Sequence, residues 1–218
     1  MHVVVLSSGG LDSTTLVYYL LKLGHVPHLL YIAYGQRHSK EEEFSRTVAA
    51  NLGLGWTKVE LGLVLESSAL TNQELEIPSG NYTTESLKVT VVPNRNAIFA
   101  NIAAAVAADH RAEAIALAVH AGDHPVYRDC RPEFIGGLKK FLSLSLDNPL
   151  DVMAPFVYIP KAAIVLLGDI LNVPFDLTWS CYKGEELHCG TCSTCRDRME
   201  AFAKAGVPDP TPYGIWKI

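Results

Sequence analysis

The sequence lacks the features of a membrane protein and of a strongly basic nucleic-acid binder. None of its apolar runs approaches the length of a membrane-spanning helix, and residues 1–6 contain neither a basic region nor a signal-peptide cleavage site. Asp and Glu outnumber Lys and Arg by 23 to 18, whereas broad nucleic-acid binding needs a basic surface. We therefore expect a cytoplasmic protein with small-molecule substrates, without membrane contact and without direct contact to nucleic acid.

Internal repeats and low-complexity tracts are also missing. The chain has 218 residues, of which 49% are hydrophobic, enough for one α/β domain with a small appendage. Segments typical of strands alternate with segments typical of helices, which predicts a doubly wound parallel sheet with right-handed crossovers. The predicted strands are 3–6, 26–36, 57–61, 113–120 and 151–156, and the predicted helices after the first are 39–53, 94–110, 132–146 and 161–173. A capping box of Ser39 and Glu42 is expected to begin helix 39–53, and the polar segment 78–86 is expected to form a loop over a site.

A polar turn separates the first predicted strand from the first predicted helix. Residues 3–6 are contiguous apolar residues, and apolar side chains recur at helical spacing over residues 16–23. Between these two segments, glycine amides, serine hydroxyls and a helix N-terminus direct hydrogen-bond donors to one place, as they do in phosphate-binding sites. A simple helix cap needs only one such residue. The turn has neither the lysine of a Walker A loop nor the pattern G-x-G-x-x-G. The predicted phosphate-binding residues are Ser7, Ser8, Gly9, Gly10, Leu11, Asp12, Ser13 and Thr14.

Four of the five cysteines lie close together near the end of the chain. They are Cys181, Cys189, Cys192 and Cys195, spaced C-x7-C-x2-C-x2-C. In a cytoplasmic protein, cysteines this close suit tetrahedral metal coordination, and one structural zinc ion per chain is the favoured interpretation. An iron–sulfur cluster is the alternative, although the proline that usually follows the last ferredoxin cysteine is missing. Cys130 is either a small buried residue or part of a site.

Four motifs together resemble one family. The segment "SSGGLDSTT" resembles the S-G-G-x-D-S loop of N-type ATP pyrophosphatases, which cleave ATP between the α and β phosphates. Three further segments resemble the 7-cyano-7-deazaguanine synthase family: "VVPNRNAIFANIA" (91–103), "YRDCRPEFI" (127–135) and "TWSCYKGEELHCGTCSTCRDRMEAF" (178–202). Arg128 stands where this family usually has proline. The motifs spread over nearly the whole chain.

The resemblance implies a fold, a reaction and partners. The fold is a Rossmann-like sheet of the HUP/ATP-pyrophosphatase type over residues 1–175, followed by a small zinc-binding helical subdomain over residues 176–218. The reaction converts 7-carboxy-7-deazaguanine and ammonia into 7-cyano-7-deazaguanine through an adenylated acid and an adenylated amide, with release of AMP and pyrophosphate. The cofactors are zinc and the Mg²⁺ bound to ATP. The resemblance also implies a homodimer.

Charged residues outside the turn complete the predicted site. A positive charge at a helix N-terminus interacts unfavourably with the helix dipole. Lys161 stands where a helix is predicted to begin, and a functional reason would explain a lysine there, so Lys161 is a candidate for binding phosphates. Arg95 enters an apolar helix and needs an anion, either a substrate carboxylate, a phosphate or an acidic side chain. The predicted catalytic residues are Asp12, Arg95, Asp123 and Lys161, with Asp12 also a candidate magnesium ligand.

A guanine-like base has N–H donors that a carboxylate would accept. Asp123 and Asp129 are the candidates, with Arg131 keeping Asp129 ionised. His120 and His124 flank Asp123 and are either proton carriers or simply hydrogen-bonded. The predicted substrate-binding residues are Arg95, Asn96, Asp123, Asp129 and Arg131.

Three other functions remain open. A tRNA thiolation or amidation enzyme would share the ATP loop, but only Cys130 would serve as its reactive thiol, and a basic RNA-binding extension is missing. A paralogue would activate the deazapurine acid and transfer it to a different acceptor. A zinc-containing binding module without catalysis would tolerate replacement of Asp12 by alanine.

Overall fold

The computed structural model describes residues 1–37, 39–62, 67–80, 88–123 and 125–216. Most of the predicted loop at 78–86 lies outside these residues, as does His124. Within the described ranges, no helix is both long enough and apolar enough to cross a membrane.

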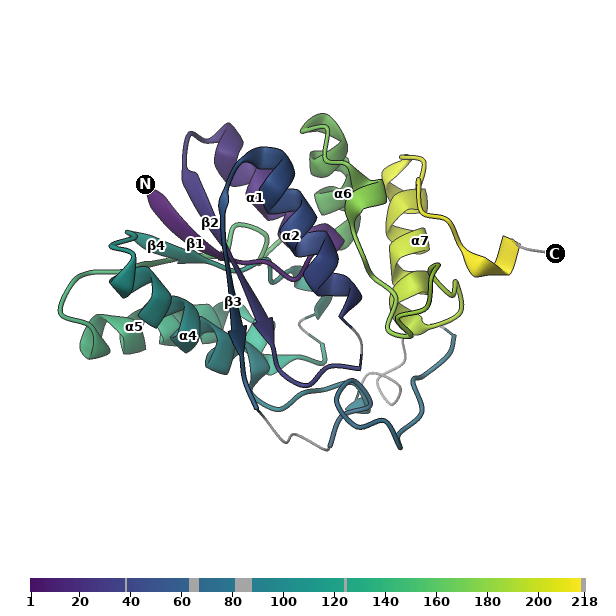
Figure 1. Ribbon diagram of the computed structural model, residues 1–218, viewed down its shortest axis with the longest axis horizontal. Coiled ribbons are helices and arrows are strands. Elements are labelled where there is room, and N and C mark those ends of the chain that lie inside the picture. Colours follow the sequence, from purple (N-terminus) through teal and green to yellow (C-terminus); the bar gives the residue numbers. More distant parts are fainter. Residues whose placement is uncertain (38, 63–66, 81–87, 124, 217–218) are drawn as a thin grey trace.

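Five parallel strands form one sheet in the order β3-β2-β1-β4-β5 (Figure 1). They are β1 (His2–Leu6), β2 (Val26–Ala33), β3 (Gly55–Glu60), β4 (Ala114–Ala116) and β5 (Asp151–Met153). Strands β2 and β3 lie on one side of β1, and strands β4 and β5 lie on its other side. In open parallel sheets, ligands bind outside the carboxyl ends of the strands at such a reversal of strand order.

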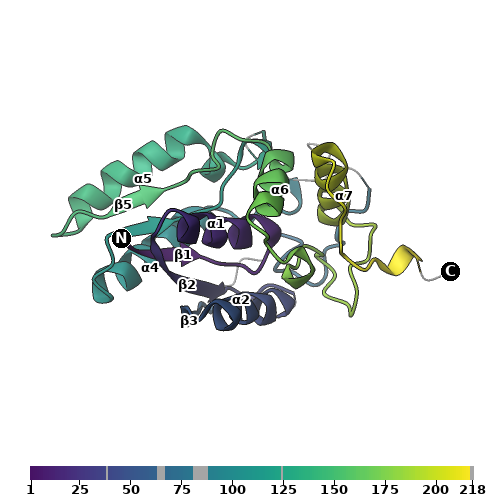
Figure 2. The same ribbon diagram turned by 90° about the horizontal axis from the view of Figure 1, so that it is seen from above.

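Helices cover both faces of the sheet, which confirms the predicted doubly wound α/β fold (Figures 1 and 2). The helices are α1 (Leu11–Lys22), α2 (Lys40–Leu52), α4 (Arg95–Asp109), α5 (Pro132–Ser145), α6 (Lys161–Ile170) and α7 (Ser193–Ala205), with short 3-10 turns η1 (Ala121–Asp123), η2 (Arg128–Cys130), η3 (Phe175–Leu177) and η4 (Gly214–Trp216). Neighbouring residues of a strand point to opposite faces. Val3 and Val5 therefore pack with α1, α2 and α6 in one buried cluster, and Val4 packs with α4 and α5 in the other.

Three predicted strands are shorter in the structure. Strand 151–156 ends at Met153. Strand 26–36 ends at Ala33, because the Tyr34 N–H donates to the Gln36 side chain at 2.7 Å. Strand 113–120 is paired only over Ala114–Ala116, and the residues after Leu117 turn toward the site described below. Because the sheet is parallel, the three shortened strands end at the same edge.

The predicted capping box at the start of α2 is wrong. Ser39 is the N-cap residue, but its side chain makes no capping hydrogen bond. The Glu42 carboxylate instead lies 3.0 Å from Lys58 Nζ on the adjacent strand β3. A tertiary ion pair has therefore replaced the local hydrogen bond that the sequence pattern predicts.

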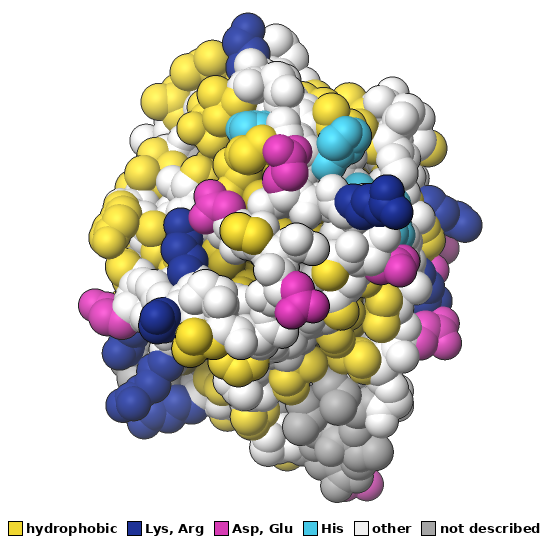
Figure 3. Space-filling model, turned by 90° about the vertical axis from the view of Figure 1, so that its left-hand side faces the viewer, with side chains coloured by type: hydrophobic (Ala, Val, Ile, Leu, Met, Phe, Trp, Pro, Cys, Tyr) yellow, Lys and Arg dark blue, Asp and Glu magenta, His cyan; other side chains and the backbone are white. Residues whose placement is uncertain are grey.

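Acidic, basic and hydrophobic side chains are interspersed over the face shown in Figure 3. Among the described residues, exposed large hydrophobic side chains include Phe141 and Leu144 on α5 and Ile170 on α6. Scattered apolar side chains of this kind are normal on protein surfaces and identify no partner.

Candidate functional site

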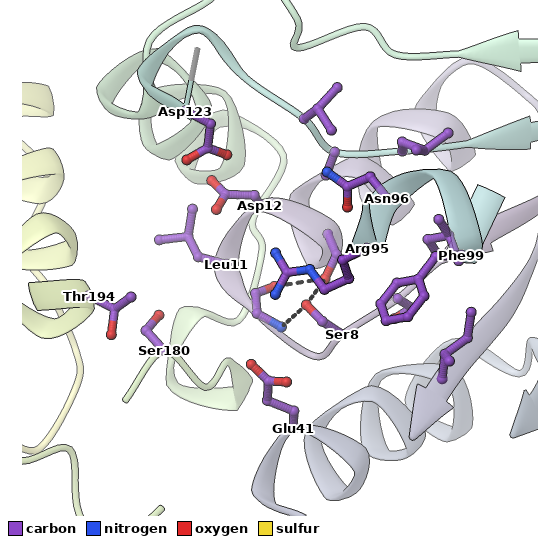
Figure 4. Close-up of a pocket in the computed structure, with 18 of the residues that line it drawn as sticks. Ser8, Leu11, Asp12, Glu41, Arg95, Asn96, Phe99, Asp123, Ser180 and Thr194 are labelled. Atoms are coloured by element: carbon purple, nitrogen blue, oxygen red, sulfur yellow. Dashed lines mark hydrogen bonds between the residues drawn. The ribbon is translucent and has the colours of Figure 1, made fainter. Parts of the chain in front are cut away.

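A cavity of about 300 Å³ lies at the carboxyl ends of β1, β2 and β4 (Figure 4). Its volume is at the lower end of the range for small-molecule pockets. Residues from distant parts of the chain line it, including α4, α6 and α7. Of the predicted residues, those that line it are Ser7, Ser8, Gly10, Leu11, Asp12, Ser13, Arg95, Asn96, Asp123 and Lys161. Gly9, Thr14, Asp129 and Arg131 are not part of the described lining.

Hydrogen bonds within the turn fix its shape. The Gly10 N–H donates to Ser8 Oγ at 3.2 Å, and the Ser13 hydroxyl donates to the Gly10 carbonyl at 3.2 Å. The Ser8 and Ser13 hydroxyl oxygens lie 3.2 Å apart. Ser7 points into the core instead, where its hydroxyl accepts a hydrogen bond from Ser45 at 3.0 Å. Ser8, Gly10 and Ser13 therefore present hydroxyl and backbone polar groups beside the cavity, in addition to the Asp12 carboxylate described below.

Gly9 allows this turn to pass directly against α2. Its φ is +75°, and a Cβ atom at this position would lie 2.4 Å from the Glu41 carbonyl oxygen and 2.6 Å from the Ser45 nitrogen. Both neighbours are backbone atoms, which move only with the helix. The position therefore requires glycine for space as well as for conformation.

Replacing Gly9 by alanine is expected to lower the free energy of unfolding by roughly 1–3 kcal/mol for overpacking, in addition to about 1 kcal/mol for the left-handed conformation. Gly24→Ala is the matched control, because Gly24 has a similar φ of +78° but nothing within 4 Å of an added Cβ. Urea unfolding measures both variants. Equal losses of stability would contradict the close approach at Gly9.

Lys161 places a permanent positive charge beside the turn. Its Nζ lies 2.7 Å from Asp197 Oδ2 on α7 and 3.4 Å from Asp12 Oδ2. Burial opposes the charge, but the two carboxylates outweigh burial and raise the pKa of Lys161. The lysine at the start of α6 is therefore held by two carboxylates at the cavity, and is not a free surface residue.

His120 links Asp12 and Asp123. Its Nδ1 accepts a hydrogen bond from the Gly122 N–H at 3.1 Å, so the neutral ring carries its proton on Nε2. Nε2 lies 3.5 Å from Asp123 Oδ2 and 3.8 Å from Asp12 Oδ2. Burial raises the pKa of Asp123, against the opposite effects of His120 and Lys161. Buried Asp12 Oδ1 has no hydrogen-bond partner in the described part of the chain, and an oxygen of this kind fits a hard cation such as Mg²⁺.

Arg95 begins α4 and is surrounded by tyrosines. It donates to the Tyr34 hydroxyl at 3.4 Å, and its guanidinium lies 6.0 Å from the centre of the Tyr34 ring. Burial disfavours the charge, but Tyr34 and the neighbouring tyrosines raise the pKa of Arg95, which stays charged. Within the described ranges, no carboxylate lies within 4.0 Å of it. The arrangement therefore leaves this cation available to an anionic ligand at the cavity.

Asp129 positions the start of α4. Its Oδ2 accepts a hydrogen bond from the Asn96 N–H at 2.9 Å, and Asn96 Nδ2 donates to the Asp129 carbonyl at 3.1 Å. The same amide contacts Cys130 Sγ at 3.2 Å. Burial raises the pKa of Cys130, so this thiol stays protonated at neutral pH, which is unfavourable for the sulfur-transfer alternative.

Two acidic residues of the cavity lining are not predicted from the sequence, Glu41 on α2 and Asp197 on α7. Asp197 follows the last clustered cysteine in "CRDRME", a run that is equally typical of a solvated helix face. Glu41 belongs to "KEEE", where three successive acids give no indication of which one lines the cavity. Neither has a local signal that distinguishes it from a surface residue.

The four clustered cysteines fit a tetrahedral metal ion. Their sulfur atoms all lie within 4.8 Å of one another and all four residues are buried. The distances from Cys195 Sγ are 3.4 Å to Cys192 Sγ and 3.9 Å to Cys189 Sγ, and four sulfurs at about 2.3 Å from a central ion would lie at comparable separations. The N–H groups of Cys189 and Lys183 point to Cys181 Sγ at 3.4 Å, which favours thiolate ligands. The predicted four-cysteine cluster is confirmed.

The cysteine-rich segment is hydrogen-bonded to the turn at residues 7–14. The Trp179 N–H donates to the Gly9 carbonyl at 2.9 Å. Arg198, fully buried on α7, donates to Thr178 Oγ1 at 2.7 Å and to the Phe175 carbonyl at 2.9 Å. These hydrogen bonds therefore fix the position of the cysteine-rich segment relative to the turn beside the cavity.

Known proteins are similar to this chain in sequence and in fold. The family model described as "Queuosine biosynthesis protein QueC" matches residues 2–206. A 7-cyano-7-deazaguanine synthase of Brucella ovis is 47% identical, and one of Brucella anthropi is 48% identical, in each case covering 98% of this chain and 94% of the relative. A crystal structure described as a predicted subunit of a tRNA methyltransferase from Methanocaldococcus jannaschii has a TM-score of 0.51 at 20% identity, covering 78% of this chain and 74% of that chain, which shows a common fold alone. The chain belongs to the QueC family of queuosine biosynthesis proteins.

Proposed function

We propose that the protein is a 7-cyano-7-deazaguanine synthase, an ATP-dependent ligase. It converts 7-carboxy-7-deazaguanine and ammonia into the nitrile and consumes two ATP, one for the acid and one for the amide. The observation that carries this proposal is the convergence of the S-G-G-x-D-S turn, Lys161 and Arg95 on one cavity at the switch point of the sheet. The 47% identity to a curated synthase over 98% of the chain supports it.

The chemistry needs activation of a poor electrophile. A carboxylate resists attack by ammonia, and transfer of AMP to one of its oxygens gives it a leaving group. In the proposed mechanism, Ser8, Gly10 and Ser13 hold the β and γ phosphates, and Lys161 neutralises charge on the departing pyrophosphate. Arg95 orients the substrate carboxylate or the α-phosphate. The protein contributes mainly by positioning and electrostatic stabilisation.

Two metal ions have fitting residues. Mg²⁺ bound with ATP would be held by Asp12, with Asp123 nearby, and would reduce the charge repulsion between the phosphates. Zinc, one per chain, would be held by the four cysteines of the cluster. Four sulfur ligands leave no open position, so this ion would organise the subdomain at 176–218 structurally. The family resemblance further supports a cytoplasmic homodimer.

The test is incubation of the purified protein with Mg²⁺, ATP, ammonium and 7-carboxy-7-deazaguanine, followed by mass spectrometry of nucleotides and bases. We expect AMP and pyrophosphate to appear with the amide first and the nitrile later. Formation of ADP and phosphate would contradict the interpretation of the turn. Formation of AMP without amide or nitrile would favour the paralogue that transfers the activated acid to a different acceptor.

A further inference from the structure

Glu41 differs from the other carboxylates of the cavity. The four acids of the described lining are Asp12, Glu41, Asp123 and Asp197. Each aspartate has Lys161 Nζ or His120 Nε2 within 4.0 Å. The pKa of the Glu41 carboxylate is affected by burial and by the positive charge of Arg95. Within the described ranges, this carboxylate accepts no hydrogen bond. It is therefore a carboxylate at the cavity whose oxygens are still available.

The position of Glu41 is fixed by the phosphate-binding turn. Its backbone carbonyl packs against Gly9, as the 2.4 Å approach to a Cβ at that glycine shows. Figure 4 shows its carboxylate directed into the cavity toward Ser8 and Arg95, from the side opposite Asp123. The acid thus borders both the group expected to hold phosphate and the group expected to hold the substrate carboxylate.

The surroundings keep Glu41 close to its titration point. Burial raises its pKa to about 7, and Arg95 on α4 acts in the opposite direction. Tyr31 and Tyr34 also act across this part of the cavity, and burial raises the pKa of both hydroxyls, so they stay neutral. The charged Arg37 lines the cavity too, and its guanidinium donates to the Asn72 and Leu75 carbonyls. A general base works best when its pKa lies near the working pH, and Glu41 meets that condition.

The reaction of the proposed function, on which this inference rests, requires a proton acceptor at the nitrogen atom. When ammonia attacks the acyl-adenylate, the C–N bond forms, the C–O bond to AMP breaks with its electron pair on AMP, and one proton leaves nitrogen. Transfer of the second AMP to the amide oxygen and its later departure remove the other two protons and leave the nitrile.

We propose that the Glu41 carboxylate accepts the protons that nitrogen loses and releases each of them to solvent. Arg95 and Ser8 place the reacting carbon beside it, whereas the aspartates at the other end of the cavity are engaged with Lys161 and His120. Glu41 is then a catalytic residue, and its role belongs to the steps in which nitrogen loses a proton and not to the first adenylation.

The test compares Glu41→Gln with Glu42→Gln. Glutamine keeps the size of glutamate but accepts no proton. Glu42 is a suitable control because its carboxylate pairs with Lys58 at 3.0 Å on the edge strand β3 and is not part of the described cavity lining. Amide and nitrile formation should fall roughly 10²-fold or more in Glu41→Gln and stay near the wild-type rate in Glu42→Gln. Acid-dependent exchange of labelled pyrophosphate into ATP reports the first adenylation alone, and it should be retained in both variants.

The pH profile supplies the second readout. The wild-type kcat should rise through a limb near pH 7 as Glu41 loses its proton, and this limb should be absent in Glu41→Gln. The increase in rate that is caused by deprotonation of ammonium is common to both proteins and serves as an internal reference. Retention of the limb or of the wild-type kcat in Glu41→Gln, or a parallel loss of exchange and amide formation, would overturn the proposal. Absence of acid-dependent exchange in the wild-type protein would instead refute the proposed function.

Discussion

Replacement of Asp12 by asparagine is expected to lower the rate of AMP formation by at least about 10²-fold, with little change in stability. Asparagine keeps the shape of the side chain but removes the negative charge. Lys161 then loses one of its two carboxylate neighbours, and Asp12 Oδ1, the buried oxygen suited to Mg²⁺, is no longer part of a carboxylate. Both changes weaken the charge balance around the departing pyrophosphate.

Acid-dependent pyrophosphate exchange and steady-state AMP release measure this effect. Asp176→Asn is the matched control, because Asp176 is an exposed aspartate on η3 outside the described cavity lining. It should retain the wild-type rate. Wild-type activity in the Asp12 variant would contradict the assignment of the turn and would favour a binding module without catalysis.

Replacement of Cys189 by serine is expected to remove the metal ion and most of the activity. A serine hydroxyl is a poor replacement for a thiolate ligand, and structural zinc contributes about 10–16 kcal/mol of apparent binding free energy in small zinc-finger peptides. Even part of this binding free energy is large compared with a total free energy of unfolding of roughly 5–15 kcal/mol. Activity should fall as well, because Asp197 on the adjoining helix pairs with Lys161 and Trp179 is hydrogen-bonded to Gly9.

Metal analysis and thermal unfolding test this prediction together. Cys130→Ala is the control, since Cys130 lies outside the cluster, and this variant should keep one zinc ion per chain. A Cys189 variant with full zinc content and unchanged stability would contradict the four-cysteine site. Iron, sulfide and visible absorbance in the wild-type protein would favour an iron–sulfur cluster over zinc.

Local patterns account for the parts of the site that the sequence predicted. The turn at residues 7–14 combines a buried strand, glycines, hydroxyls and a helix start, and the cysteines combine ligand type with spacing. Lys161 was predicted from its unfavourable place at a helix N-terminus, and the structure places it between Asp12 and Asp197. Each of these signals lies within one short segment.

The remaining features depend on contacts between distant segments. The strand order was not predictable from strand patterns, because alternation of strands and helices does not specify which strands become neighbours. Asp197 reaches Lys161 because α7 packs beside α6, and the cavity-facing position of Glu41 depends on the approach of α2 to Gly9. The capping box failed for the same reason, since Lys58 on a neighbouring strand attracts Glu42.

The most direct test of the central claim follows the two carboxylate oxygens of the substrate. When 7-carboxy-7-deazaguanine carries oxygen-18 in both positions, attack of one oxygen on the α-phosphate sends that label into the first AMP. The other oxygen stays in the amide and should leave with the second AMP. We expect one labelled oxygen in each AMP and none in the nitrile or in pyrophosphate. Label in inorganic phosphate, or AMP without label, would contradict adenylation at this site.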